Sequence, residues 1–124
     1  MVDDRAETEE LIPPSFDQHT VVLLVRPHDA PELDEPDLER LQREHLAYLR
    51  DLGRAGVLMA NGPLTEQSDE RLRGLSVYAL PPEEARRAAE ADPMVRAGRL
   101  AVEMAVWWTA EGAVAFGERA WPHG

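Results

Sequence analysis

His45 and Asp92 are the two residues of this sequence whose types and positions best suit acid–base chemistry. His45 falls between Leu41 and Tyr48 at helical spacing, so its imidazole lies on the apolar stripe of a helix. Asp92 directly precedes Pro93, where a helix is interrupted and a side chain can face a cleft. A carboxylate that holds an imidazole fixes its tautomer and stabilises its protonated form. The two residues together therefore predict a group that accepts and returns a proton.

Each of these residues also has a simpler structural interpretation. A histidine on an apolar stripe can be a core residue that is bonded to a backbone carbonyl. An aspartate before proline commonly caps the next helical turn. The two roles of Asp92 are compatible if one carboxylate oxygen caps the turn and the other meets the imidazole of His45.

Four further residues are candidates for binding a substrate. Arg26 ends the first predicted strand, and the backbone N–H of Gly62 lies in an Asn-Gly-Pro turn. Either group could hold a developing enolate oxygen, although a turn alone is the simpler interpretation of residues 61–63. Pro63, in the same turn, and Tyr48, on the stripe of His45, complete the candidate substrate-binding set.

We expect no catalytic or metal-binding role for the other polar side chains. His19, His28 and His123 are expected to be solvated or incidental, and the adjacent acidic pairs are expected to be solvated charge. The sequence has no HExxH, GxxxxGK[ST] or GxGxxG motif, so we expect no metal and no cofactor. Trp107 and Trp108 are expected to be core and interface residues, with stacking on a ligand as the alternative.

Alternating and helical patterns predict the elements that must position His45 and Asp92. Strands are expected at residues 20–25, 57–60, 75–80 and 102–108, and helices at residues 37–55 and 83–91. Asp34 or Asp37 is expected to cap the first helix, and Gly56 to end it. The order β-α-β-β-α-β predicts an α+β, ferredoxin-like sandwich: a four-stranded antiparallel sheet with two helices on one face.

The predicted strands are too apolar for a sheet with one wet face. Residues 21–25 are apolar throughout, and the fourth strand has apolar residues on both sides. Since two helices cover only one face, an exposed apolar face would remain, and such faces usually mark interfaces. We therefore expect a homodimer that packs sheet to sheet, with roughly 800 Å² buried per subunit as in an ordinary interface.

Composition limits the classes of function. The chain has 124 residues and a formal net charge of −11, with no cysteine and with arginine as its only strong base. This charge disfavours nucleic acid as a partner, and the absence of lysine excludes Schiff-base catalysis. No apolar run could span a membrane and no secretory signal is evident, so we expect a cytoplasmic protein. We divide it into an acidic flexible extension (1–17), a globular domain (18–110) and a C-terminal tail (111–124).

Taken together, several short segments resemble the YciI-like (YCII-related) family over residues 20–109. The matching segments are the strand at 21–26, the helical segment 44–49, the turn 62–64, the blocks 83–85 and 91–93, and the strand that ends at Trp108. The resemblance implies a ferredoxin-like fold of the dimeric α/β-barrel group and a His–Asp site, which falls on His45 and Asp92. A few relatives remove chloride from a chlorinated hydroxyquinol, and structurally similar proteins isomerise muconolactone. The acidic extension, the Pro-rich first loop and the tail depart from the compact family pattern.

Three functions follow from these observations. The favoured one is a cofactor-free isomerase or lyase in which His45 is the general acid or base, acting on a small cyclic oxygenated substrate. The alternative is a dimeric module that binds or senses a small molecule without changing it. The third, implied by the resemblance to the dimeric α/β-barrel group, is a haem-handling or monooxygenase protein, with His45 as the proximal ligand in the haem version. The lack of a second well-placed histidine and the pairing with Asp92 disfavour it.

Overall fold

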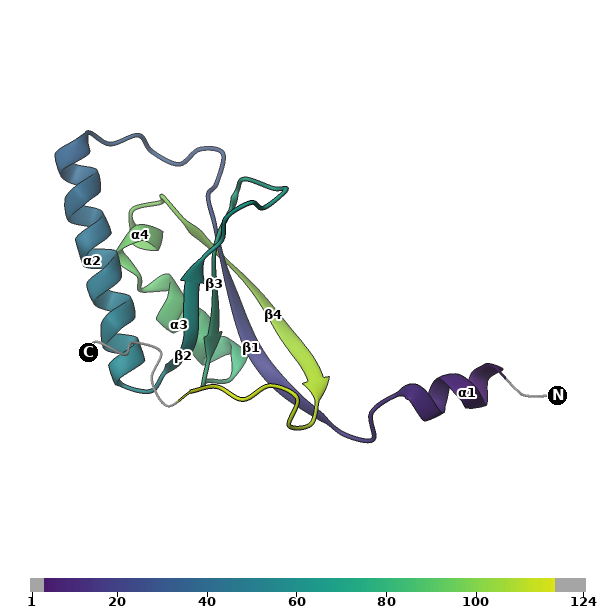
Figure 1. Cartoon of the computed structure of the whole chain (residues 1–124). Coiled ribbons are helices and arrows are strands. Elements are labelled where there is room, and N and C mark those ends of the chain that lie inside the picture. Colours follow the sequence, from purple (N-terminus) through teal and green to yellow (C-terminus); the bar gives the residue numbers. More distant parts are fainter. Residues whose placement is uncertain (1–3, 118–124) are drawn as a thin grey trace.

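A computed structural model describes residues 4–117 of the chain (Figure 1). The elements follow in the order α1 (Asp4–Leu11), β1 (Phe16–Val25), α2 (Glu35–Arg54), β2 (Leu58–Pro63), β3 (Leu72–Tyr78), α3 (Pro82–Glu90), α4 (Pro93–Arg96) and β4 (Ala101–Ala110). No helix among them combines the length and the apolar composition that crossing a membrane would need.

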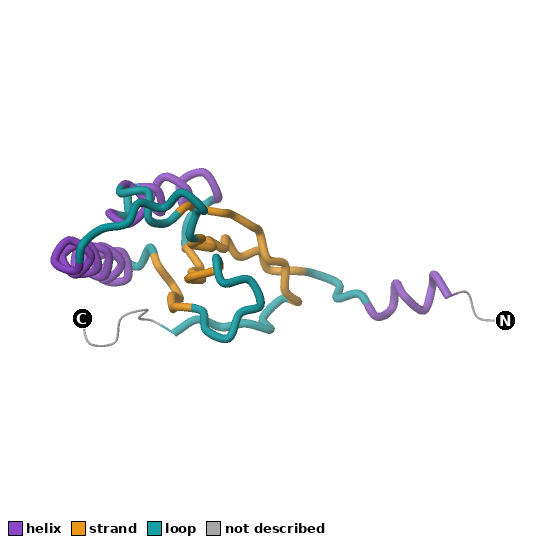
Figure 2. Tube along the Cα trace, turned by 90° about the horizontal axis from the view of Figure 1, so that it is seen from above, coloured by secondary structure: helices purple, strands orange, loops and turns teal. Residues whose placement is uncertain are grey.

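The four strands form one antiparallel sheet in the order β2-β3-β1-β4. This α+β architecture confirms the predicted class and is consistent with a ferredoxin-like sandwich. β1 occupies the centre because it is apolar on both sides: Val22 and Leu24 join the main core, and Val21 and Val25 are buried on the opposite face. Figure 2 shows α2 and α3 on the same side of the sheet, with α2 towards its β2 edge.

Helix α2 carries His45 and packs its apolar stripe, including Leu41 and Leu49, into the core. Asp34 is the N-cap, and its carboxylate accepts a hydrogen bond from the backbone N–H of Asp37 at 3.0 Å. The helix begins earlier than residue 37, because Pro36 lies in the first turn, where its missing N–H costs nothing. Gly56 follows the helix at φ +76°, the left-handed conformation that suits a stop.

Strands β2 and β3 extend further than the sequence pattern indicates. Residues 61–63 were expected to form a turn, but Asn61 pairs with Ser76, and Pro63 pairs with Gly74. Proline is tolerated there because it is the last residue of an edge strand. β3 begins at Leu72, so residues that were expected to belong to a loop lie in the sheet.

The acidic N-terminal segment is not wholly irregular. Residues 4–11 form α1, which buries none of its side chains, and Figure 1 shows it projecting away from the sheet. Leu11 is 84% exposed and Ile12 is 52% exposed, so neither anchors the segment to the described chain. β1 begins at Phe16, inside the expected extension, because its first residues pair with the end of β4.

Residues 111–117 return across the sheet on the face opposite α3 (Figures 1 and 2). Phe116 packs edge-on against His19, with ring centroids 5.3 Å apart. His19 is therefore buried, contrary to the expectation that it is solvated, and its Nε2 lies 3.0 Å from the hydroxyl of Thr109. His28 is exposed as expected, and His123 lies outside the described residues.

Candidate functional site

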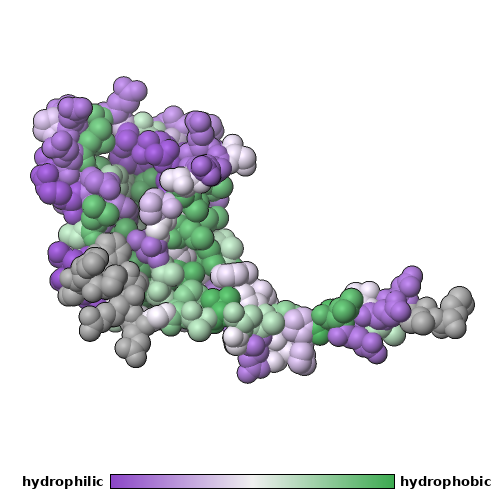
Figure 3. Space-filling view, viewed as in Figure 1, coloured by the Kyte–Doolittle hydropathy of each residue, from purple (hydrophilic) through white to green (hydrophobic). Residues whose placement is uncertain are grey.

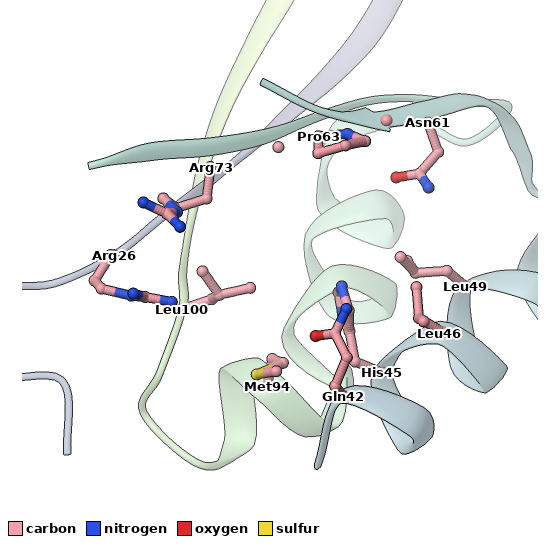
Figure 4. A pocket seen from close by; sticks show the side chains of 12 residues that line it. Arg26, Gln42, His45, Leu46, Leu49, Asn61, Pro63, Arg73, Met94 and Leu100 are labelled. Carbon is pink, nitrogen blue, oxygen red and sulfur yellow. The ribbon is translucent and has the colours of Figure 1, made fainter. Parts of the chain in front are cut away.

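A cavity of about 250 Å³ lies between α2, α4 and the adjoining strands β2 and β3 (Figure 4). It has a polar part and an apolar part. Its polar lining includes Arg26, Gln42, His45, Asn61 and Arg73. The rest of its lining is Leu46, Leu49, Gly62, Pro63, Gly74, Met94 and Leu100.

The His45–Asp92 pair predicted from the sequence is present beside this cavity. Nδ1 of His45 lies 2.8 Å from Oδ1 and 2.7 Å from Oδ2 of Asp92. The imidazole keeps 12% of its surface exposed, whereas the carboxylate keeps only 2%. α2 supplies the histidine and the break between α3 and α4 supplies the aspartate, so the pair joins two elements across 47 residues of sequence.

Asp92 fills both of the roles that the sequence leaves open. It is the N-cap of α4, and its Oδ1 accepts a hydrogen bond from the backbone N–H of Met94 at 2.9 Å. Pro93, at the first position of α4, has no N–H to satisfy. The cap fixes the carboxylate, and the fixed carboxylate fixes the imidazole of His45.

This geometry decides which ring nitrogen of His45 can meet a ligand. An ionised carboxylate only accepts hydrogen bonds, so Nδ1 of His45 is the donor to Asp92. The proton-accepting position of the neutral ring is then Nε2, for which residues 4–117 supply no hydrogen-bond partner. A histidine held in this way can take a proton at Nε2, and the resulting positive charge lies against the Asp92 carboxylate.

Three of the four predicted substrate-binding residues line the cavity: Arg26, Gly62 and Pro63. Tyr48 does not line it. Its hydroxyl donates a hydrogen bond of 2.6 Å to the backbone carbonyl of Ala88, on α3, so this side chain joins two helices. We therefore leave Tyr48 out of the candidate site.

Sequence reasoning missed three polar residues of the lining: Gln42, Asn61 and Arg73. Gln42 lies three residues before His45 on α2, and that helical spacing was a usable signal. Asn61 and Arg73 were assigned to a turn and a loop, and only the longer strands place them at the cavity. The amide Oδ1 of Asn61 accepts a hydrogen bond of 2.8 Å from Ser76, which leaves its amide nitrogen as the donor.

The polar groups of the site are mainly hydrogen-bond donors. Within residues 4–117, no three His, Asp or Glu side chains gather as metal ligands would. His45 has its single carboxylate partner, and the other polar lining groups carry amide or guanidinium donors.

The fold and the site define an α+β protein with a His–Asp pair at a small cavity. In a comparison with known families, the profile of the YCII-related domain matches residues 20–108. The chain belongs to this family. The match includes His45, Asp92 and every residue that lines the cavity. No curated protein matches the chain.

Proposed function

We propose that this protein is a cofactor-free enzyme that moves a proton on a small cyclic oxygenated substrate, with His45 as general base and acid. The observation that carries the proposal is the 2.7 Å contact between Nδ1 of His45 and the buried carboxylate of Asp92, beside a cavity that His45 also lines. Positioned proton transfer of this kind accelerates a reaction by about 10²–10⁴-fold.

The proposed reaction begins when Nε2 of His45 removes a proton from a carbon next to a carbonyl group. The C–H electron pair moves into the substrate, and negative charge collects on the carbonyl oxygen as an enolate. The amide nitrogen of Asn61 and the guanidinium of Arg26 are donors in the same lining that can stabilise this charge. The imidazolium is meanwhile stabilised by Asp92.

The enolate can react further in two ways. In an isomerisation, the proton on Nε2 returns to a different carbon of the substrate. In an elimination, a neighbouring leaving group departs with its electron pair, and His45 then passes the proton to water. A cavity of about 250 Å³ holds a compound of one ring, and the side chains of Leu46 and Leu49 give that ring an apolar wall.

Hydrogen–deuterium exchange tests this proposal without a known substrate. The protein in D₂O is mixed with a panel of cyclic ketones, lactones and hydroxylated aromatic compounds, and NMR follows the loss of acidic C–H signals. We expect exchange above the buffer rate with the natural chain, and about 10²–10⁴-fold less with His45→Gln. Glutamine can still donate to Asp92, so the buried carboxylate keeps a partner.

His28→Gln is the matched control, because it removes an exposed imidazole from a loop. Exchange that His28→Gln retains and His45→Gln loses supports the general base. Equal exchange by the natural chain and His45→Gln contradicts it. If a compound binds in the cavity and no proton of any panel member exchanges, the result favours a module that binds a small molecule without catalysis.

A further inference from the structure

We propose that the cavity binds the oxyanion group of a small organic acid, through Arg26 and Arg73, opposite the imidazole of His45. The oxyanion is a carboxylate or a phosphate-type group, and both present negatively charged oxygens to the two guanidinium groups. This inference deepens the proposed function, on which it rests, by naming the class of substrate.

The charged side chains that face His45 across the cavity are arginines, although the chain as a whole is acidic. The chain carries a formal net charge of −11, yet Arg26 and Arg73 both line the cavity and Arg99 lies nearby. Figure 4 shows the two lining guanidinium groups at one end of the cavity, across from His45 and Gln42. Positive charge gathered in a hollow of an acidic protein concentrates anions there.

Arg26, Arg73 and Arg99 lack carboxylate partners within residues 4–117. Arg40, Arg50, Arg71 and Arg86 all pair with acidic side chains. Arg73 and Arg99 instead donate to the backbone carbonyls of Glu70 and Pro31. Nε of Arg26 and Nε of Arg99 are buried without any hydrogen-bond partner in this part of the chain. A buried unpaired donor is costly, so the fold holds these guanidinium groups in place without compensation from its own acceptors.

The guanidinium groups near the cavity repel one another. Burial lowers the pKa of Arg26, and the positive charges of Arg99 and Arg73 lower it further. The folded chain therefore holds these like charges close together at a cost in stability. A bound oxyanion would reverse the repulsion, and the planar guanidinium fork matches the two oxygens of a carboxylate or a phosphate.

A second hollow adjoins the first, and the two share Arg26, Gln42 and Met94 in their linings. Arg43 and Arg99 add further positive charge to this hollow, and Glu39 is the acidic residue of its lining. The basic side of the cavity is thus open towards further guanidinium groups. The apolar lining comes from Leu46 and Leu49 on α2 and from Pro63, Met94 and Leu100 on other elements, and the two leucines of α2 lie beside His45, where the body of the ligand can pack.

Equilibrium binding tests the inference with three compounds that share a phenyl ring and differ in their head group: benzoate, phenylphosphonate and neutral benzamide. Calorimetry measures affinity, and the ring signals of His45 in NMR show whether the ligand lies in this cavity. We expect either anion to bind at least about ten-fold more tightly than benzamide and to shift the His45 signals. The affinity should fall as salt is added. The anion that binds more tightly identifies the oxyanion as carboxylate or phosphate-type.

The variants Arg26→Gln and Arg73→Gln should each weaken anion binding by about ten-fold or more and leave benzamide unchanged. Arg71→Gln is the matched control: it removes the same charge two residues from Arg73, where Asp69 already neutralises it. The backbone bond from the Arg26 N–H to the Arg71 carbonyl survives this change. Arg26→Lys keeps the charge but loses the fork, so its affinity should lie between those of the natural chain and Arg26→Gln.

Equal affinity for benzoate and benzamide, anion binding that survives both glutamine variants, or no anion binding at millimolar concentration would overturn the inference. None of the three compounds has an acidic C–H bond next to a carbonyl group, so this test does not depend on proton transfer. Loss of exchange in His45→Gln can therefore stand while anion binding fails, and the reverse can also occur.

Discussion

At the scale of single residues, the site depends on how Asp92 divides its two oxygens. Oδ1 accepts from the backbone of α4 and lies within hydrogen-bond distance of the imidazole, and Oδ2 lies 2.7 Å from the same ring nitrogen. A carboxylate that is buried without partners is costly, and here it has both a helix N-terminus and a histidine. The bonds that stabilise this charge are the same bonds that orient His45.

Asp92→Asn separates these two roles. The amide oxygen of asparagine can still cap α4, but its NH₂ group donates, so Nδ1 of His45 must accept and the ring proton moves to Nε2. We expect the exchange rate to fall by about 10²–10⁴-fold. ¹⁵N NMR of the imidazole reports the tautomer directly.

Asp92→Ala is the comparison, because it removes the cap as well. In urea unfolding it should be less stable than Asp92→Asn by about 1 kcal/mol. If Asp92→Asn has the altered tautomer and keeps full exchange activity, the tautomer of His45 does not matter to the chemistry.

The sequence predicted the pair because each member carries a local signal. A polar residue on an apolar stripe marks His45, and a carboxylate before proline marks Asp92. Asn61 and Arg73 carry no such signal. Their positions depend on how far β2 and β3 pair, and that is decided by contacts between segments distant in sequence.

At the scale of elements, α2 contributes side chains both to the cavity and to the hydrophobic core, and Leu49 belongs to both. Gln42, His45, Leu46 and Leu49 line the cavity. Tyr48 instead reaches α3 through its bond to the carbonyl of Ala88. α2 and α3 are therefore fixed to each other independently of the cavity, which keeps His45 aligned with the residue that follows α3.

Tyr48→Phe tests this connection through pH. Burial raises the pKa of Tyr48 above its ordinary value of 10.0, Asp92 raises it further, and Arg96 opposes the shift. The unfolded chain releases this proton near pH 10 while the native chain keeps it. The stability that Tyr48 contributes is therefore complete below pH 10 and is lost as pH rises towards the native pKa.

Urea unfolding measures the outcome. At pH 8, Tyr48→Phe should be less stable by about 1 kcal/mol, because a hydrogen bond to Ala88 is lost. The difference should shrink above pH 10. Burial also raises the pKa of Tyr78, and Tyr48 raises it further, so Tyr48→Phe removes part of that shift as well, and this makes the difference shrink in the same direction at high pH. A stability difference that is constant between pH 8 and pH 11 would show that the hydroxyl of Tyr48 does not keep its proton through burial.

Element types were largely predictable, and element ends were not. Periodicity identified α2, β1 and β4 because their apolar patterns are long. The start of α2 at Glu35 depends on the capping bond from Asp34, and the extra residues of β1 and β4 depend on their mutual pairing. The helix at residues 4–11 lacks the buried stripe on which such a prediction relies.

At the scale of the whole molecule, the face of the sheet opposite the helices has two parts. Residues 111–117 cross one part, where Phe116 packs against His19. On this face, Trp107 lies beside His19, with ring centroids 5.5 Å apart, and is still 46% exposed, and Leu75 on β3 is 39% exposed. Figure 3 shows apolar residues gathered over this side of the sheet. The expected sheet-to-sheet dimer would bury this uncovered part, and we retain the dimer as a proposal.

Leu75→Glu tests the dimer, because it places a charge where two apolar faces would meet. Sedimentation equilibrium should give twice the chain mass of 13.9 kDa for the natural protein and the chain mass for the variant. Leu11→Glu is the matched control: it makes the same substitution on α1, where the side chain is 84% exposed and away from the sheet. A natural chain that stays monomeric at all concentrations would contradict the dimer.

The salt dependence of association is a second, independent test of the proposed dimer. Each chain carries a formal net charge of −11, so two chains repel each other as they approach. Salt screens that repulsion and leaves the burial of apolar surface almost unchanged. Dimerisation should therefore strengthen as salt is added, whereas binding of an oxyanion to Arg26 and Arg73 should weaken. Opposite responses to salt would show that the sheet face and the cavity are two separate surfaces of the molecule.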